Sequence, residues 1–113
     1  MYAFPSLLRD TSTIDAYMER ARALKHEEQI FPQEVRHLIR KLDASLPHAQ
    51  AGSGRRKVPG SRHSYAEVTR QVEALRSVLL AAEVVKKTRD VSEVPIPLQN
   101  QAKNQLLRAI LAL

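Results

Sequence analysis

The longest helical pattern in the chain lies at residues 64–89, which read SYAEVTRQVEALRSVLLAAEVVKKTR. It opens with Ser64 and Glu67 in the Ser-x-x-Glu spacing of a capping box, in which each residue satisfies a free backbone amide of the other. Apolar side chains then recur at steps of three and four residues, the period of one helical face: Tyr65, Val68, Val72, Leu75, Leu79 and Ala82. At 1.5 Å per residue this helix is about 37 Å long and spans the roughly 34 Å of a compact domain of this size.

Three further segments carry helical spacing, at about 12–28, 32–46 and 98–113. Ser12 is suited to cap the first, and Pro32 suits the first position of the second because its missing N–H would be unpaired there. Pro95 and Pro97 predict extended chain over residues 91–97, since proline disfavours helical geometry at itself and just before itself. No segment alternates with the period of a strand. We predict an all-α fold, a small irregular bundle of about four helices in which two short helices pack against the long third helix.

Residues 47–63 lack helical periodicity and contain all three glycines of the chain. We predict a flexible loop there, between the second and third helices. The loop carries four basic residues and no acidic one, and these are Arg55, Arg56, Lys57 and Arg62. We expect residues 1–113 to form a single helical domain, because a chain of 113 residues allows one domain and little more.

The composition excludes several classes of protein. Lys and Arg number 18 against 12 for Asp and Glu, a formal net charge of +6, and most of this excess lies on the predicted loop. The absence of cysteine excludes disulfide scaffolds, thiol nucleophiles and thiolate metal sites. The longest apolar runs are about five residues, far short of the roughly 20 that cross a bilayer, and the N-terminus lacks a secretory signal pattern. We therefore expect a cytoplasmic protein that does not contact membranes.

The basic residues make nucleic acid one candidate partner. A glycine-rich basic loop can mould its amides and guanidinium groups around phosphates, and the polar face of the second predicted helix adds further basic side chains. The candidate nucleic-acid-binding residues are Arg36, Arg40, Lys41, Arg55, Arg56, Lys57 and Arg62. The competing interpretation is a solvated connector beside the solvated outer face of an amphipathic helix.

No residue pattern meets the requirements of a catalytic or metal site. The four histidines are spaced 11, 11 and 15 residues apart, so no two share a helical face. Glu83 is the only carboxylate within a strongly apolar stretch, and we expect it at the edge of a packed seam, paired with a basic residue at position 86, 87 or 89. We therefore predict no enzymatic activity, no metal or other cofactor, and no small-molecule substrate.

The third predicted helix is apolar nearly all round between positions 78 and 85, and the end of the fourth is similar. Such helices must be buried on most sides, yet the first two helices offer only narrow apolar faces. We expect part of this surface to remain exposed and to contact a protein. The candidate interface residues are Leu75, Val78, Leu79, Val85, Leu106, Leu107, Ile110 and Leu111. The alternative is a self-contained four-helix domain whose core absorbs all of them.

Two hypotheses about function follow. In the first, the chain is a small non-enzymatic interaction protein that forms a homo-oligomer or binds a protein partner through the apolar faces of the third and fourth helices. In the second, it binds nucleic acid through the basic loop at 55–62 and the basic face of the second helix. Steep salt dependence of binding is specific to the second hypothesis.

Overall fold

The computed structural model describes residues 13–46, 55–91 and 93–113. Its elements are the α-helices α2 (Thr13–Ala23), α3 (Pro32–Asp43), α4 (Tyr65–Asp90) and α5 (Ile96–Leu111), with a 3₁₀ turn η1 (Leu24–His26) after α2. No strand occurs among these described residues, and the predicted all-α bundle is confirmed. The predicted cap at Ser12 and the first half of the predicted loop lie outside the described residues.

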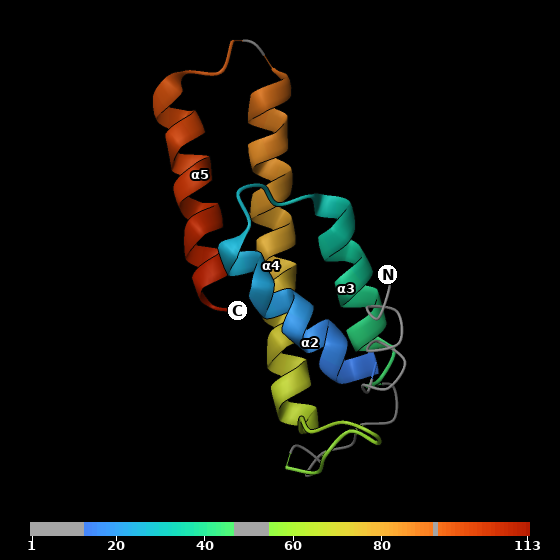
Figure 1. The fold of residues 1–113 in the computed structure, drawn as a ribbon. Coiled ribbons are helices and arrows are strands. Elements are labelled where there is room, and N and C mark those ends of the chain that lie inside the picture. Colours follow the sequence, from blue (N-terminus) through green and yellow to red (C-terminus); the bar gives the residue numbers. More distant parts are fainter. Residues whose placement is uncertain (1–12, 47–54, 92) are drawn as a thin grey trace.

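Helix α4 is the axis of the bundle (Figure 1). Helix α3 lies along one side of it, α5 runs antiparallel along the other, and α2 crosses over one face. The predicted capping box begins α4: the Glu67 N–H donates to Ser64 Oγ at 3.2 Å, and the Ser64 N–H donates to Glu67 Oε1 at 3.2 Å. The clearest helix signal in the sequence therefore places the element on which the others pack.

The core lies where α2, α3 and α5 meet α4. Each described helix contributes buried apolar side chains to one continuous cluster, as does η1. Burying a Leu or Val side chain stabilises a fold by about 1.5–3 kcal/mol, so this cluster is the main source of stability. Its largest fully buried members are Leu24, Leu38, Leu42, Leu75, Val35, Val68 and Val78.

Two predicted helices end earlier than expected. Helix α3 stops at Asp43 rather than 46, because the Ser45 and Leu46 amides bond the carbonyls three residues back and form a tighter turn. Helix α2 stops at Ala23 and continues only as the 3₁₀ turn η1, after which the chain is extended at Glu27. The predicted continuation of the first helix to residue 28 is therefore wrong.

Helix α5 starts earlier than expected, at Ile96 rather than 98. Pro97 lies in its first turn, where the missing proline N–H costs no helical hydrogen bond. The Leu98 and Gln99 amides both bond the carbonyl of Pro95, at 3.0 and 3.1 Å. The expectation that the chain is extended through Pro97 is therefore wrong.

The predicted flexible loop is an ordered turn over the residues that the structure describes, 55–63. The Val58 N–H donates to the His63 carbonyl at 2.9 Å, and an isolated antiparallel bridge joins Lys57 to Ser64. Pro59 and Gly60 stand at the centre of the turn, in the order of a type II turn, and Gly60 has the positive φ of 76° that this turn requires. Val58 is buried in the core cluster, which anchors the turn to the bundle.

The outer half of the α4/α5 hairpin extends beyond α2 and α3 (Figure 1). The radius of gyration is accordingly 16.1 Å, larger than the roughly 13 Å of a compact domain of this length. Large apolar side chains are exposed along this hairpin, and they are Leu80, Val84, Val91, Ile96, Leu98, Leu107 and Leu111. In the described part of the chain no helix has the length and apolar character to cross a membrane.

One polar side chain lies in the packed region of α4. Gln71 is only 7% exposed, and its Nε2 has no hydrogen-bond partner among the described residues. A buried amide without a partner destabilises the folded state, because it loses its hydrogen bonds to water on folding.

We predict that Gln71→Met raises the free energy of unfolding by about 1 kcal/mol, because it removes this donor and keeps the side-chain length. Urea unfolding followed by circular dichroism measures the change. Gln71→Glu, which places a charge at the same position, is expected to lower stability. A destabilising Gln71→Met would show that the amide makes a favourable polar contact.

Candidate functional site

The predicted interface residues divide into two groups. Leu75, Val78 and Ile110 are buried in the chain's own core cluster, and this corrects their assignment to a partner surface. Leu79, Val85 and Leu106 are partly buried, and Leu79 and Leu106 pack against the same core. Only two of the eight remain largely exposed. We call these two, Leu107 (59% exposed) and Leu111 (75% exposed), the α5 leucine face.

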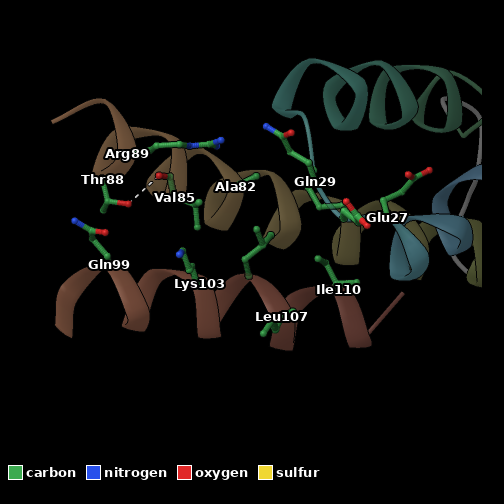
Figure 2. Close-up of a pocket in the computed structure, with 13 residues that line it drawn as sticks. Glu27, Gln29, Ala82, Val85, Thr88, Arg89, Gln99, Lys103, Leu107 and Ile110 are labelled. Carbon is green, nitrogen blue, oxygen red and sulfur yellow. Dashed lines mark hydrogen bonds between the residues drawn. The ribbon is translucent and has the colours of Figure 1, made fainter. Parts of the chain in front are cut away.

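A groove of about 430 Å³ lies between α4 and α5, closed at one side by the chain that follows η1 (Figure 2). We call it the α4/α5 groove. Its apolar lining comes from both helices and from the connecting chain, and includes Ile30, Ala82, Val85, Leu106 and Ile110. Leu107 also lines it, so the α5 leucine face is continuous with the groove.

Charged side chains of opposite sign lie at the two ends of this groove. Figure 2 shows Glu27 near Ile110, whereas Arg89 and Lys103 lie toward the hairpin turn. Glu28, next to Glu27 in the chain, lines the same groove. The groove therefore has an apolar middle, an acidic end and a basic end.

Three of the seven candidate nucleic-acid-binding residues are bound by other parts of the chain. Arg36 forms an ion pair with Glu83, with a nitrogen to oxygen distance of 2.5 Å, so the expected pairing of Glu83 with position 86, 87 or 89 is corrected. The partner of Glu83 comes from α3, 47 positions away, and not from the neighbouring basic residues of α4. Lys57 donates to the Arg62 carbonyl at 2.5 Å, and the Arg62 Nε lies 3.4 Å from Asp15 Oδ2.

The other four candidates are Arg40, Lys41, Arg55 and Arg56. All are exposed, and none has an acidic partner among the described residues. Arg40 and Lys41 lie in the last turn of α3, at the end of the bundle where the ordered turn also lies (Figure 1). The fold therefore gathers these cations at one end, away from the α4/α5 groove.

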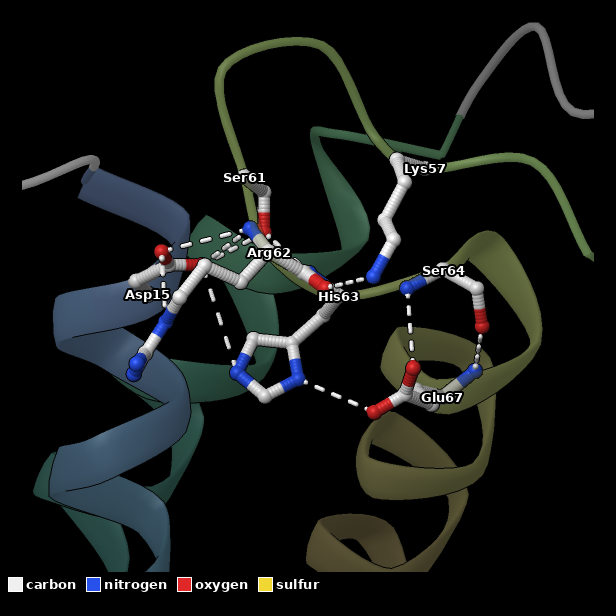
Figure 3. Close-up of polar contacts among 7 residues, drawn as sticks. All are labelled: Asp15, Lys57, Ser61, Arg62, His63, Ser64 and Glu67. Carbon is white, nitrogen blue, oxygen red and sulfur yellow. Dashed lines mark hydrogen bonds and ion pairs between the residues drawn. The ribbon is translucent and has the colours of Figure 1, made fainter.

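Asp15 anchors the ordered turn to α2 (Figure 3). It is 7% exposed and accepts the Ser61 hydroxyl at 2.5 Å and the Arg62 N–H at 3.1 Å. The imidazole of His63 lies between Asp15 and Glu67, with Nε2 4.0 Å from Asp15 and Nδ1 3.1 Å from Glu67. We call these residues the Asp15 cluster, and they join α2, the turn and the start of α4.

The cluster lowers the pKa of both carboxylates. Burial by itself raises the pKa of Asp15, but the hydrogen bonds from Ser61 and from the Arg62 amide, with the charges of His63 and Arg62, together lower it below its usual value. The hydrogen bond with His63, followed by that from the Ser64 amide, lowers the pKa of Glu67 to about 2. Both groups are therefore stabilised as carboxylates in the folded chain.

The cluster contains the residue types of a hydrolase triad without its geometry. Ser61 Oγ donates to Asp15 and accepts the backbone N–H of His63, so the described contacts include no bond from the hydroxyl to the imidazole. In the part of the chain that the structure describes, no group of three or more His, Asp or Glu side chains could hold a metal ion. The contacts of the Asp15 cluster instead hold the ordered turn against α2.

The sequence did not predict the main residues of the Asp15 cluster or of the acidic end of the α4/α5 groove. Asp15 is recognisable in the sequence only as a favourable charge near a helix N-terminus, because its partners lie 46 and 47 positions away. Glu27 and Glu28 lie at the end of the first predicted helix and carry no motif. Only the capping box at Ser64 and Glu67 pointed to part of the Asp15 cluster.

Comparisons of the chain with protein-family models, with curated proteins and with solved structures find no match. The candidate functions therefore depend on the geometry of the groove, of the α5 leucine face and of the basic end of the bundle.

We predict that Asp15→Asn lowers the free energy of unfolding by about 1–3 kcal/mol at pH 7, because it removes a charge from a buried hydrogen-bonded carboxylate. The folded-state pKa of Asp15 is depressed, so its contribution is present above the unfolded pKa near 3.8 and is lost as the pH falls further. The difference between wild type and variant should therefore shrink below about pH 4.

Urea unfolding at a series of pH values from 7 to about 2 measures this dependence. Glu67→Gln should act in the same direction, its effect disappearing as the pH falls from 4.5 toward about 2. Exposed Glu73, for which the structure gives no ion pair among the described residues, provides the matched control Glu73→Gln. Equal acid sensitivity of wild type and the Asp15 variant would contradict the role of the cluster.

Proposed function

We propose that the protein is a non-enzymatic interaction protein that binds a protein surface or helix at the α5 leucine face and the α4/α5 groove. The observation that carries the proposal is the continuity of the two features. Leu107 and Leu111 stand one turn apart on α5, 59% and 75% exposed, and Leu107 also lines the apolar groove.

A single exposed leucine is ordinary on a protein surface, but this pair is not isolated. Its apolar area continues into the partly buried side chains of Val85 on α4 and Leu106 on α5, which line the same groove. Continuous exposed apolar areas bounded by polar residues are typical of protein contact sites. The charged ends of the groove supply such a boundary.

The shape of the groove suits an amphipathic helix. Two antiparallel helices form its walls, and its apolar middle lies between an acidic and a basic end. A helix seated there would bury residues at i, i+3, i+4 and i+7, the pattern of helix-in-groove recognition. Its N-terminus, which carries the positive end of the helix dipole, would be favoured at the acidic end.

We predict that Leu107→Lys combined with Leu111→Lys abolishes partner binding, because charges replace the centre of the apolar face. Both side chains are exposed, so helical content should be unchanged and the free energy of unfolding should change by less than about 0.5 kcal/mol. Circular dichroism and urea unfolding test these two expectations. By contrast, Leu106→Lys, at a position packed against the core, should unfold the domain.

Binding itself is measured by placing a photo-crosslinking amino acid at position 107 in cells that naturally make the protein. Adducts are expected from position 107 and not from the exposed position 105 on another face of α5. A complete absence of adducts at 107 would contradict the proposed function. So would unfolding of the double lysine variant, since it would place both leucines in the core.

Nucleic acid is a second candidate partner, at the opposite part of the molecule. The observation that favours it is the grouping of Arg40, Lys41, Arg55 and Arg56 at one end of the bundle, without acidic partners among the described residues. The ordered turn supports Arg55 and Arg56, because the Arg56 carbonyl accepts the Tyr65 amide at 2.9 Å.

For this second function we predict that log affinity for duplex DNA falls with log salt concentration with a slope of about −3 to −4, as for four neutralised phosphates. Arg55→Ala with Arg56→Ala should reduce the steepness of that slope by about 2. Fluorescence anisotropy at several salt concentrations gives both values. Binding that does not respond to salt, or to these substitutions, would exclude this site.

A further inference from the structure

The α5 leucine face and the charges beside it form a self-complementary pattern. Leu107 lies midway between Lys103 and Leu111, four residues from each, or about 6 Å along the helix axis. The acidic pair Glu27 and Glu28 lies at the end of the groove near Ile110, whereas Lys103 lies toward the other end (Figure 2). One face of the chain therefore carries an apolar centre with opposite charges on its two sides.

We propose that the occupant of this face is a second copy of the same chain, and the proposal rests on the function proposed above. The α5 helices of the two copies lie antiparallel, with a two-fold axis beside Leu107. Leu107 of each copy meets Leu107 of the other, and Leu111 of each lies at the level of Lys103 of the other.

The charges select this orientation over a parallel one. In the antiparallel pair, Lys103 of each copy reaches the acidic end of the other copy's groove, where Glu27 and Glu28 lie. In a parallel pair, Lys103 would face Lys103 and the acidic ends would face each other, which is unfavourable. A two-fold contact uses the same patch on both copies, so every favourable contact occurs twice.

The pattern also distinguishes a second copy from an unrelated partner. The groove needs an apolar helix face with a positive charge one turn to its N-terminal side, at the acidic end. The described chain presents such a helix on its own surface, as Lys103, Leu107 and Leu111 of α5. These side chains are exposed and adjoin the groove that they would complement, so no rearrangement of the bundle is required.

The first experiment measures the mass of the purified full chain by light scattering on a sizing column. The expected mass is twice 12.8 kDa, and Leu107→Lys is expected to halve it with unchanged circular dichroism. The matched control is Gln105→Lys, which places the same charge on another exposed face of α5 and should leave the dimer intact. A wild-type monomer at about 100 µM, or a dimer that survives Leu107→Lys, would overturn the proposal.

The second experiment tests the pairing of charges. Lys103→Glu alone should give a monomer, because acidic groups then face one another at both contacts, and Glu27→Lys with Glu28→Lys should do the same with basic groups. An equimolar mixture of the two variants should recover the dimer mass, because each contact of the mixed pair again joins opposite charges. Monomers that do not recombine on mixing would overturn the antiparallel arrangement.

The experiments distinguish failure of the second-copy proposal from failure of the proposed interaction function. Crosslinks from position 107 that join the chain to a protein of another mass, with a monomeric wild type, would overturn the second copy and retain the interaction face. No crosslink from position 107 at all would overturn both. Crosslinks from position 107 at twice the mass of the chain would support both the second copy and the interaction face, provided that Leu111→Lys abolishes them.

Discussion

The length of α4 constrains the rest of the structure. It has 26 residues, about 39 Å, whereas α2 and α3 have 11 and 12 residues and can cover only about 18 Å of it. Among the described elements, only α5 accompanies α4 along its outer half. The core is therefore concentrated where all four helices overlap, and the outer hairpin keeps exposed apolar side chains. The α4/α5 groove lies where the cover from the shorter helices ends, beside the chain that joins η1 to α3.

Acidic side chains of the helices contact basic ones from other elements. Glu34 pairs with Arg20 across α2 and α3, and Glu83 pairs with Arg36 across α3 and α4. These pairs are exposed, and exposed pairs contribute little to stability. Asp15 differs because it is buried, and its hydrogen bonds to the turn attach a loop to the core. Four of the seven candidate nucleic-acid-binding residues, at positions 40, 41, 55 and 56, have no acidic partner among the described residues.

Local signals in the sequence predicted most of the helical architecture. The capping box located the start of α4, and Pro32 located the start of α3. The prolines near residue 96 led to a wrong prediction of the start of α5. Proline breaks a helix when it lies in the interior, but it is well suited to the first turn, where Pro97 lies. The turn at 55–63 was missed because its order comes from Asp15 and from burial of Val58, which are contacts between segments distant in sequence.

The candidate interaction face was predicted only in part. The sequence indicated more apolar surface than two narrow helical faces could cover, but it could not rank the leucines of α4 and α5. Leu106 and Leu107 are adjacent in the chain, yet one packs on the core and the other is exposed, because the rotation of α5 against α4 decides which side faces inward. The acidic end of the groove arises from a connecting segment whose path no local pattern predicts.

The sequence alone determined the elements: the number of helices, the long third helix and the position of the excess positive charge. These depend on local physics, namely helical periodicity, caps and prolines, which act within a few residues. The tertiary structure alone decided which apolar side chains remain exposed, which cations stay unpaired and where opposite charges face a common groove. Those outcomes depend on how far each helix extends along α4, a property of the packed molecule and not of any one segment.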